Sequence, residues 1–281
     1  MPRVRGIFRF GRNDGGVVEM TTAPAKRNAP VPALPGGETV PDPGPEQIPL
    51  PLGMRSEPSL ENFIPGPNRE AREAIKKIAD GMGERVIYLW GIRGTGKSHL
   101  LAAARRGVAR RDRKAVSLSY RTSPSIRASI IDGIQKITLI CIDDIDAKAG
   151  YKEWEETLFY LYNLAEASGT RLLVAGEQNP TGAGFSSPDL RSRLSAALVL
   201  RLHPLDDDGR RMALKCRARE WGFTLSDRVI AFLLRRCQRD MHSLFALLEK
   251  IDQGTLVEKR RVTIPFVRNL LTTSAKHIES H

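Results

Sequence analysis

The stretch Val86-Ile-Tyr-Leu-Trp90-Gly91-Ile-Arg-Gly94-Thr-Gly96-Lys97-Ser98 decides the fold. Its first five residues are β-branched, aromatic or aliphatic, which is typical of a buried strand. The next eight match the phosphate-binding pattern G-x-x-x-x-G-K-[ST], and a helical pattern begins at Lys97. In such a loop, backbone N–H groups surround the phosphates, the lysine reaches the terminal phosphates, and the serine faces Mg²⁺. The sequence therefore predicts a strand, loop and helix that bind a nucleoside phosphate.

A second motif follows a second apolar run. Ile137–Ile142 is rich in β-branched residues and leads directly into Asp143 and Asp144. A buried strand that ends in paired carboxylates, downstream of a phosphate loop, is typical of the Walker B arrangement. The first Asp would hold Mg²⁺ and the second would lie near the attacking water.

Helices and strands alternate through the first two thirds of the chain. The patterns predict helices at 68–81, 97–111 and 154–167, strands at 86–90, 115–120, 137–142 and 171–175, and a short apolar run at 198–202. Such alternation favours a parallel sheet covered on both faces. After Pro204 only helices are expected, at 206–221, 226–236 and 241–251, with a short segment at 264–271. We expect an α/β body followed by a small all-helical lid.

The first 46 residues differ in texture from the rest. Seven prolines lie between Pro24 and Pro45, and no apolar periodicity accompanies them. Such a stretch cannot bury enough surface to offset its ordering entropy, so residues 1–46 are predicted to be disordered.

Charge and composition limit the setting more than the function. The 281 residues contain 44 Lys+Arg and 32 Asp+Glu, a net charge of +12 that permits a nucleic acid or an acidic protein as partner and decides neither. No apolar run approaches the length of a membrane span, and no apolar segment follows Arg3 and Arg5 as in a secretory signal. Cys141, Cys216 and Cys237 lack metal-type spacing, which favours a reducing, cytoplasmic location.

A third motif, Ser187-Pro-Asp-Leu-Arg-Ser-Arg193-Leu194, is by itself only a basic turn into a helix. Together with the phosphate loop, the Asp-Asp strand and a helical lid, it resembles the AAA+ ATPases. The resemblance implies that Arg193 is an arginine finger, which reaches the nucleotide of a neighbouring subunit and stabilises charge on the transferring phosphoryl group. Arg191 is the alternative, but the motif aligns on Arg193.

Within the AAA+ ATPases the chain resembles the DnaA branch, and in it the Hda family of DnaA-homologous regulators. The matching segments are 59–71, 96–101, 219–223, 239–244 and 263–267, and the similarity covers about residues 47–271. The resemblance implies a AAA+ nucleotide-binding domain at 53–204, a helical lid at 205–272 and a C-terminal tail at 273–281. It further implies ADP or ATP bound by Phe63, Ile64, Asn68, Gly94, Thr95, Gly96, Lys97, Ser98, His99, Asp144, Glu177 and His242, with Mg²⁺ on Ser98 and Asp143.

The segment Gln47-Ile-Pro-Leu50-Pro-Leu52 resembles the Q-[LI]-x-L-P-L peptide by which this family docks on the sliding clamp, the β subunit of the DNA polymerase. Prolines hold such a peptide extended at low entropic cost. The resemblance implies that Gln47, Ile48, Leu50, Pro51 and Leu52 form the clamp-binding site.

Two positions depart from the family pattern. His242 stands where many DnaA-like lids have an arginine, and a histidine is mostly uncharged near neutrality. Glu177 stands where the polar sensor after the 171–175 strand is usually Asp or Asn. Both changes imply weak intrinsic ATP hydrolysis, if any, rather than a free-standing enzyme.

The resemblance implies a negative regulator of chromosomal replication initiation. Bound to the clamp, and through it to DNA, the protein would present Arg193 to ATP-bound DnaA and drive hydrolysis of that ATP. No membrane partner is expected, and a homo-oligomer is possible. Two alternatives remain open: a helicase-loader-type ATPase related to DnaC, and a DNA-binding adaptor that uses the basic cluster at 105–114.

Overall fold

The computed structural model describes residues 57–119, 133–236, 240–258 and 262–276. All of them fall within one structural unit, Pro49–His281. The tail at 1–46 and the predicted clamp peptide, with Gln47, Ile48, Leu50, Pro51 and Leu52, lie outside the described residues. No helix in the described part of the chain is both long and apolar enough to cross a bilayer.

Five parallel strands form the sheet of the body, in the order β2-β3-β4-β1-β5. They are β1 (Val86–Trp90), β2 (Lys114–Ser119), β3 (Ile137–Asp143), β4 (Arg171–Gly176) and β5 (Leu198–Arg201). The chain leaves β1 for the far edge at β2, passes through β3 and β4, and ends at β5 on the other side of β1. Ligands of open parallel sheets bind where the strand order reverses, outside the carboxyl ends of the strands.

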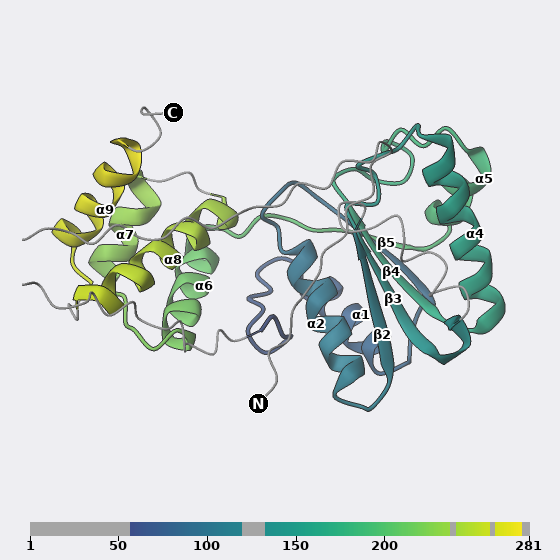
Figure 1. Cartoon of the computed structure of the whole chain (residues 1–281), viewed down its shortest axis with the longest axis horizontal. Coiled ribbons are helices and arrows are strands. Elements are labelled where there is room, and N and C mark those ends of the chain that lie inside the picture. The colour runs from purple at the N-terminus through teal and green to yellow at the C-terminus, as the bar shows by residue number, and fades with distance from the viewer. Residues whose placement is uncertain (1–56, 120–132, 237–239, 259–261, 277–281) are drawn as a thin grey trace, which may run out of the picture. The chain divides into compact units, whose positions relative to one another are not determined.

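Helices cover both faces of the sheet (Figure 1). α1 (Arg69–Ala79) and α2 (Lys97–Ala109) share one apolar cluster with Leu89 and Cys141, whereas α4 (Lys152–Ser168) and α5 (Pro188–Ser195) share another with Tyr88 and Ile140. Alternate residues of each strand therefore supply opposite faces, as the period-2 geometry of a strand requires. The predicted parallel sheet with two covered faces is confirmed.

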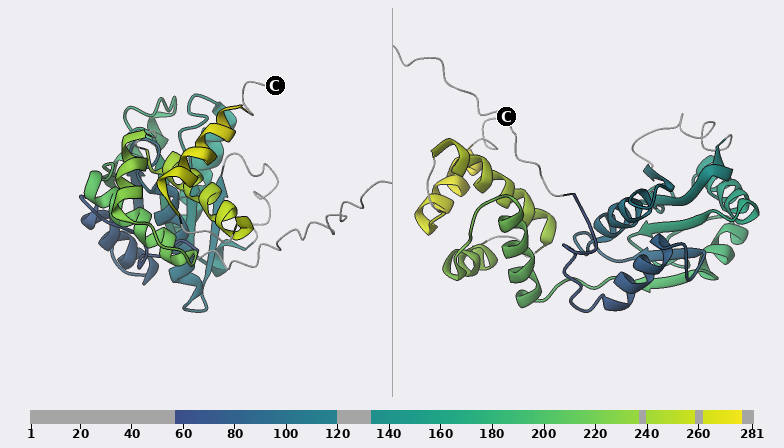
Figure 2. Two further views of the ribbon diagram at one scale, coloured as in Figure 1. Left: turned by 90° about the vertical axis from the view of Figure 1, so that its left-hand side faces the viewer. Right: turned by 90° about the horizontal axis from the view of Figure 1, so that it is seen from below.

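Four helices follow β5 and pack on one another, coloured green to yellow in Figure 2. They are α6 (Asp207–Glu220), α7 (Asp227–Arg236), α8 (Met241–Glu258) and α9 (Ile264–Lys276). Their apolar side chains form a third core that includes Leu214, Ile230 and Leu248. The predicted all-helical lid is confirmed.

Several boundaries differ from the predictions. α2 ends at Ala109 rather than Arg111, because the chain turns at Asp112, whose φ is 54°. α8 continues beyond the predicted Ile251, and α9 runs to Lys276, into the segment predicted as a tail. A short 3₁₀ helix, Ile134–Lys136, precedes β3 and is not predicted from the sequence.

Candidate functional site

The phosphate loop connects β1 to α2 and depends on glycine at two positions. Gly94 and Gly96 have φ of 82° and 98°, in the left-handed region that disfavours side chains. A Cβ at Gly96 would also lie 2.8 Å from Cε2 of Phe63. The hydroxyl of Thr95 donates to the carbonyl of Ile92 at 2.9 Å and braces the loop. The motif therefore folds as a compact loop whose backbone opens onto a pocket.

The ammonium of Lys97 is held inside this loop. Its side chain is only 7% exposed, and Nζ donates to the carbonyls of Gly91 at 2.5 Å and Ile92 at 3.2 Å. A buried cation is stable only where polar groups compensate for lost water. These contacts fix a positive charge at the start of α2, where the helix dipole also favours an anion.

The carboxylates at the end of β3 meet the loop from the neighbouring strand. Burial raises the pKa of Asp143, while a hydrogen bond from Ser98 acts to lower that pKa. Oδ1 of Asp143 also accepts from the backbone N–H of Asp144 at 3.1 Å. Asp144 has a φ of 52°, which is uncommon for a residue with a side chain and typical of functional sites. Two hard oxygen donors, from Ser98 and Asp143, fit Mg²⁺, which keeps several waters and takes its remaining ligands from phosphates.

The loop after β4 is fixed by two residues that the sequence analysis did not select. Oδ2 of Asp146 accepts from the backbone N–H groups of Glu177 at 2.7 Å and Gln178 at 3.0 Å. The hydroxyl of the fully buried Tyr88 donates to the carbonyl of Gln178 at 3.0 Å, and burial raises the pKa of this tyrosine. Glu177 is thereby held at the rim of the pocket. The sequence feature that points to this contact is a tyrosine hydroxyl between two aliphatic residues, Ile87 and Leu89, of a buried strand.

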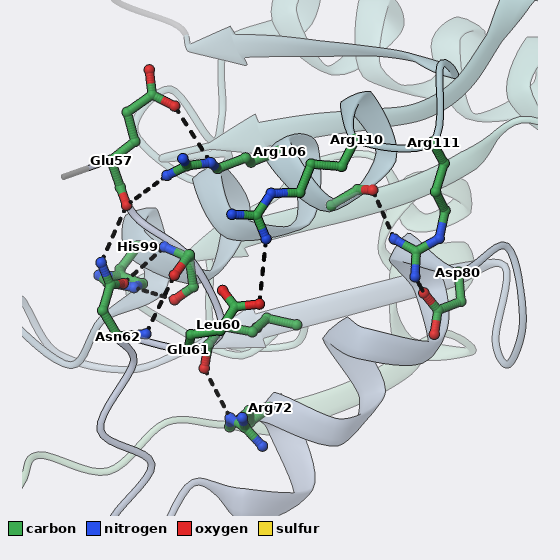
Figure 3. Close-up of polar contacts among 12 residues, drawn as sticks. Glu57, Leu60, Glu61, Asn62, Arg72, Asp80, His99, Arg106, Arg110 and Arg111 are labelled. Atoms are coloured by element: carbon green, nitrogen blue, oxygen red, sulfur yellow. Dashed lines mark hydrogen bonds and ion pairs between the residues drawn. The ribbon is translucent and has the colours of Figure 1, made fainter.

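The segment before α1 brings Phe63 to the loop, and Figure 3 shows the polar contacts that hold this segment. The segment has no regular structure, but its carbonyls are fixed to both neighbouring helices. Arg106 donates to the carbonyl of Glu57 at 3.0 Å, Arg72 to that of Leu60 at 3.2 Å, and the ring of His99 lies 2.9 Å from the carbonyl oxygen of Ser59. These contacts place Phe63 over Gly96, with its ring centroid 5.4 Å from that of His99.

Burial gives His99 a pH-dependent contribution to stability. Burial lowers its pKa below 6.5, while the nearby charges of Arg217 and Glu220 act in opposite directions. The unfolded chain then binds a proton more readily than the folded chain. We expect the free energy of unfolding to fall as the pH drops below about 6.5, and to fall less in His99→Gln.

Urea unfolding at fixed ionic strength between pH 5 and 8 measures this effect. His203→Gln is the matched control because His203 is exposed. An equal pH slope in His99→Gln and in the parent protein would contradict the prediction.

His242 at the start of α8 also lies at the phosphate loop. A Cβ on Gly94 would meet the backbone nitrogen of Met241 at 3.3 Å, and Nη2 of Arg93 lies 3.3 Å from Nε2 of His242. Arg93 was not predicted from the sequence, because it occupies a variable position of the motif. Its guanidinium brings a permanent positive charge next to the histidine that replaces the usual arginine.

These groups surround one cavity of about 540 Å³. It is lined by eleven of the predicted nucleotide-binding residues: Phe63, Ile64, Gly94, Thr95, Gly96, Lys97, Ser98, His99, Asp144, Glu177 and His242. Lining residues that the sequence analysis missed include Asn62, Arg93, Cys216, Arg217, Glu220 and Phe245. The lining therefore combines a cationic, glycine-rich loop with aromatic side chains, groups that fit a phosphate chain and a base.

Asn68 lies outside the lining of this cavity. It is only 3% exposed, and its carboxamide accepts from the N–H of His203 at 2.7 Å and donates to the carbonyl of the same residue at 2.9 Å. Of the predicted nucleotide-binding residues, all of which the structure describes, it alone does not line the cavity. Asn68 ties the segment before α1 to the segment after β5, and its contact with nucleotide stays a prediction.

Arg193 lies on α5, and the residues that line the cavity do not include it. Its Nη1 pairs with Oε2 of Glu166 at 3.0 Å, and its guanidinium carbon lies 5.2 Å from the ring centroids of both Phe159 and Tyr162. The side chain remains 38% exposed. Arg191 is exposed on the same helix. Arg193 therefore contacts α4 at the surface and is not among the described residues that line the chain's own cavity.

Comparison with known families agrees with this arrangement. The model of the bacterial DnaA ATPase domain matches residues 54–201. The chain belongs to the bacterial DnaA ATPase family. The model of the Hda lid domain matches residues 207–271, which covers α6 to most of α9. The chain is thus a DnaA-homologous AAA+ protein with an Hda-type lid, and the family resemblance found in the sequence is confirmed.

Solved structures share the fold of this DnaA-family chain. Domain III of the replication initiation protein DnaA from Thermotoga maritima gives a TM-score of 0.67 at 21% identity, covering 76% of this chain and 95% of that one. AMPPCP-bound DnaA from Aquifex aeolicus gives 0.59 at 23% identity, covering 72% and 68%. The RuvB Holliday junction branch migration motor from Thermotoga maritima gives 0.59 at 19% identity, covering 78% and 72%. At these identities the likeness shows the AAA+ fold alone.

Proposed function

We propose that this protein is a negative regulator of replication initiation that stimulates hydrolysis of the ATP bound to DnaA. The observation that carries the proposal is the position of Arg193 in a DnaA-family chain with an Hda-type lid. The guanidinium is paired with Glu166 and partly exposed, and Arg193 is absent from the described lining of the chain's own cavity. An arginine in this position is suited to act on the nucleotide of another AAA+ chain.

The protein's own cavity would hold ADP or ATP. Gly94, Gly96 and Lys97 would contact the phosphates, and Phe63 is an aromatic side chain next to this loop. DnaA from Aquifex aeolicus, which shares the fold, has been solved with AMPPCP bound. Ser98 and Asp143 would hold Mg²⁺, which neutralises phosphate charge when it is bound. Because the cavity is lined by residues of both the AAA+ domain and the lid, the nucleotide, ADP in the working state, would stabilise the competent arrangement of the two.

Lys97→Ala tests this nucleotide site. The substitution removes a charge-assisted contact worth about 1.5–3 kcal/mol. We expect the Kd for ADP to rise at least about tenfold, which corresponds to about 1.4 kcal/mol. Isothermal titration calorimetry measures it, with Lys152→Ala as control, because Lys152 is a fully solvated lysine on α4, 88% exposed. An unchanged Kd for Lys97→Ala would show that the phosphates bind elsewhere.

The proposed partners are DnaA and the DNA polymerase sliding clamp, with DNA reached through the clamp. The clamp assignment depends on Gln47–Leu52, which precede the first residues of the cavity. Docking through a peptide outside the nucleotide site would leave Arg193 free for DnaA.

A self-contained ATPase of the helicase-loader type is the second candidate. Lys97, Ser98 and Asp144 line one cavity, and Asp143 is hydrogen-bonded to Ser98; this arrangement favours the second candidate, since these groups serve the chain's own nucleotide. The DNA-binding adaptor has less support. Of its basic cluster, Arg106, Arg110 and Arg111 form ion pairs with Glu57, Glu61 and Asp80, so much of that charge is neutralised within the chain (Figure 3).

A reconstituted assay separates the two candidates. DnaA preloaded with labelled ATP is mixed with the full-length protein, with and without DNA-loaded clamp, and phosphate release is followed. We expect release from DnaA only when the protein and the loaded clamp are both present. Rapid hydrolysis of the protein's own ATP without DnaA would favour the self-contained ATPase.

A further inference from the structure

Four side chains of α4 lie on one face of that helix and point to α5 and the loop before it. Glu155, Phe159, Tyr162 and Glu166 are spaced by four, three and four residues, which places them along one stripe of a 3.6-residue helix. The first member contacts the chain that leads into α5, and the other three surround the guanidinium of Arg193. We call this set the α4 face.

Glu155 determines where α5 begins. Its side chain is 3% exposed, yet both oxygens are satisfied by backbone N–H groups: Gly150 at 2.7 Å, Ser186 at 2.8 Å and Ser187 at 2.6 Å. A buried carboxylate is costly unless it accepts several such bonds, and here they hold its pKa below the usual value. Ser187 is the N-cap of α5, with its hydroxyl accepting from the N–H of Leu190 at 3.3 Å.

The rotation of α5 about its own axis is fixed by its core contacts. Leu190 and Leu194 are 1% and 2% exposed and pack into the apolar cluster below the helix. Arg193 precedes Leu194 and therefore emerges at the edge that faces α4. The helix has only eight residues, so a shift of its first turn would move Arg193 by a similar amount.

The other three members hold the guanidinium once the helix is set. Phe159 and Tyr162 each have a ring centroid 5.2 Å from the guanidinium carbon, within cation–π range, and Glu166 accepts one hydrogen bond at 3.0 Å. A guanidinium carries five N–H donors, so donors other than this one remain for an anion. A long arginine side chain held in this way has already lost most of its rotational freedom.

We propose that the α4 face is a positioning device for Arg193: Glu155 sets the start of α5, the two aromatic rings orient the guanidinium, and Glu166 is the counter-ion that the phosphoryl group on DnaA replaces. This inference rests on the proposed function of Arg193 as a finger. It assigns the four residues a positioning role and no contact with nucleotide. The conformational entropy of the Arg193 side chain is then lost when the protein folds, so it does not add to the free-energy barrier of hydrolysis.

The first test is the double variant Phe159→Leu with Tyr162→Leu, which keeps apolar side chains and removes both rings. We expect the rate of DnaA-bound ATP hydrolysis at saturating protein to fall about tenfold, because a small misplacement of a catalytic group has effects of this order. The half-saturating protein concentration and the Kd for ADP should remain within about twofold, since Arg193 acts on the reaction and not on docking.

Two controls accompany it. Tyr162→Phe keeps the ring and should restore the parent rate. Tyr160→Leu removes a tyrosine that is 51% exposed on the same helix and should change nothing. Glu155→Gln supplies an independent variant, which should also lower the saturated rate with unchanged ADP affinity. If circular dichroism shows Glu155→Gln to be unfolded, the double leucine variant decides alone.

A measurement without DnaA separates failure of this inference from failure of the proposed function. In full-length protein labelled with ¹⁵N-arginine, the Nε–Hε group of Arg193 should be ordered in the parent and in Tyr162→Phe, and mobile in the double leucine variant. If Arg193→Ala is inactive but the double leucine variant hydrolyses DnaA-bound ATP at the full rate, the positioning role is overturned. The role is also overturned if the Arg193 side chain stays ordered in the double leucine variant. If Arg193→Ala itself keeps full activity, the proposed function fails, and the mobility measurement alone decides whether the α4 face orders the arginine.

Discussion

Arg193→Ala is expected to lower the stimulated hydrolysis of ATP on DnaA by about a thousandfold or more. An arginine finger stabilises charge that develops on the phosphoryl group only in the transition state, and such fingers contribute about 10³–10⁵ in rate. ADP affinity should be unchanged, because Arg193 is not among the described residues that line the cavity. Clamp binding should also be unchanged, because the proposed clamp peptide ends at Leu52. Phosphate release from DnaA preloaded with labelled ATP, with clamp and DNA present, measures the effect.

Arg191→Ala is the matched comparison for this experiment. It removes the same charge from the same short helix, but from an exposed side chain outside the aligned finger position. We expect a milder loss than for Arg193→Ala, because no contact comparable to those with Glu166, Phe159 and Tyr162 orients Arg191 among the interactions described. Stimulation by Arg193→Ala at the parent rate would refute the assignment of Arg193 as the finger. A larger loss in Arg191→Ala than in Arg193→Ala would identify Arg191 as the finger instead.

Local patterns were sufficient to predict the body of the fold. The strand Val86–Trp90 is observed with its predicted ends, because a β-branched run stops at a glycine that must turn. Helix ends were less predictable where tertiary contacts decide them. α8 was predicted to end at Ile251 but passes through Gly254, where a Cβ would lie 2.9 Å from Cζ of Phe266. The absence of a Cβ at Gly254 lets α9 pack closely against α8. This packing outweighs the low helix propensity of glycine, so α8 continues through it.

The candidate site was predictable where its residues adjoin the motifs, and less so elsewhere. Gly94–Ser98 and Asp144 line the cavity as their pattern implies. Asn68 was assigned to the nucleotide from its neighbours in the sequence, but its partner is His203, which lies 135 residues away. Tyr88 contacts Gln178 across 90 residues, a pairing that only the parallel β1–β4 contact creates.

Residues that act on the backbone were missed for a related reason. Asp146 and Glu155 each bind consecutive backbone N–H groups of a distant loop. Backbone N–H groups leave no side-chain signature in a sequence, so such carboxylates resemble ordinary surface residues. Their burial and hydrogen bonds, which the fold creates, distinguish them.

Replacing Gln47 and Leu50 with alanine is expected to abolish clamp binding. The two side chains provide the amide and one apolar anchor of the proposed peptide, and buried anchors of this kind contribute about 2 kcal/mol or more each. Together their loss should weaken binding by about a thousandfold or more. Surface plasmon resonance on immobilised clamp measures it. Nucleotide affinity should be unchanged, because the described residues that line the cavity begin at Pro58. Glu46→Ala, adjacent to the peptide but outside it, should bind like the parent, and undiminished clamp affinity in the double variant would show that the protein docks through another surface.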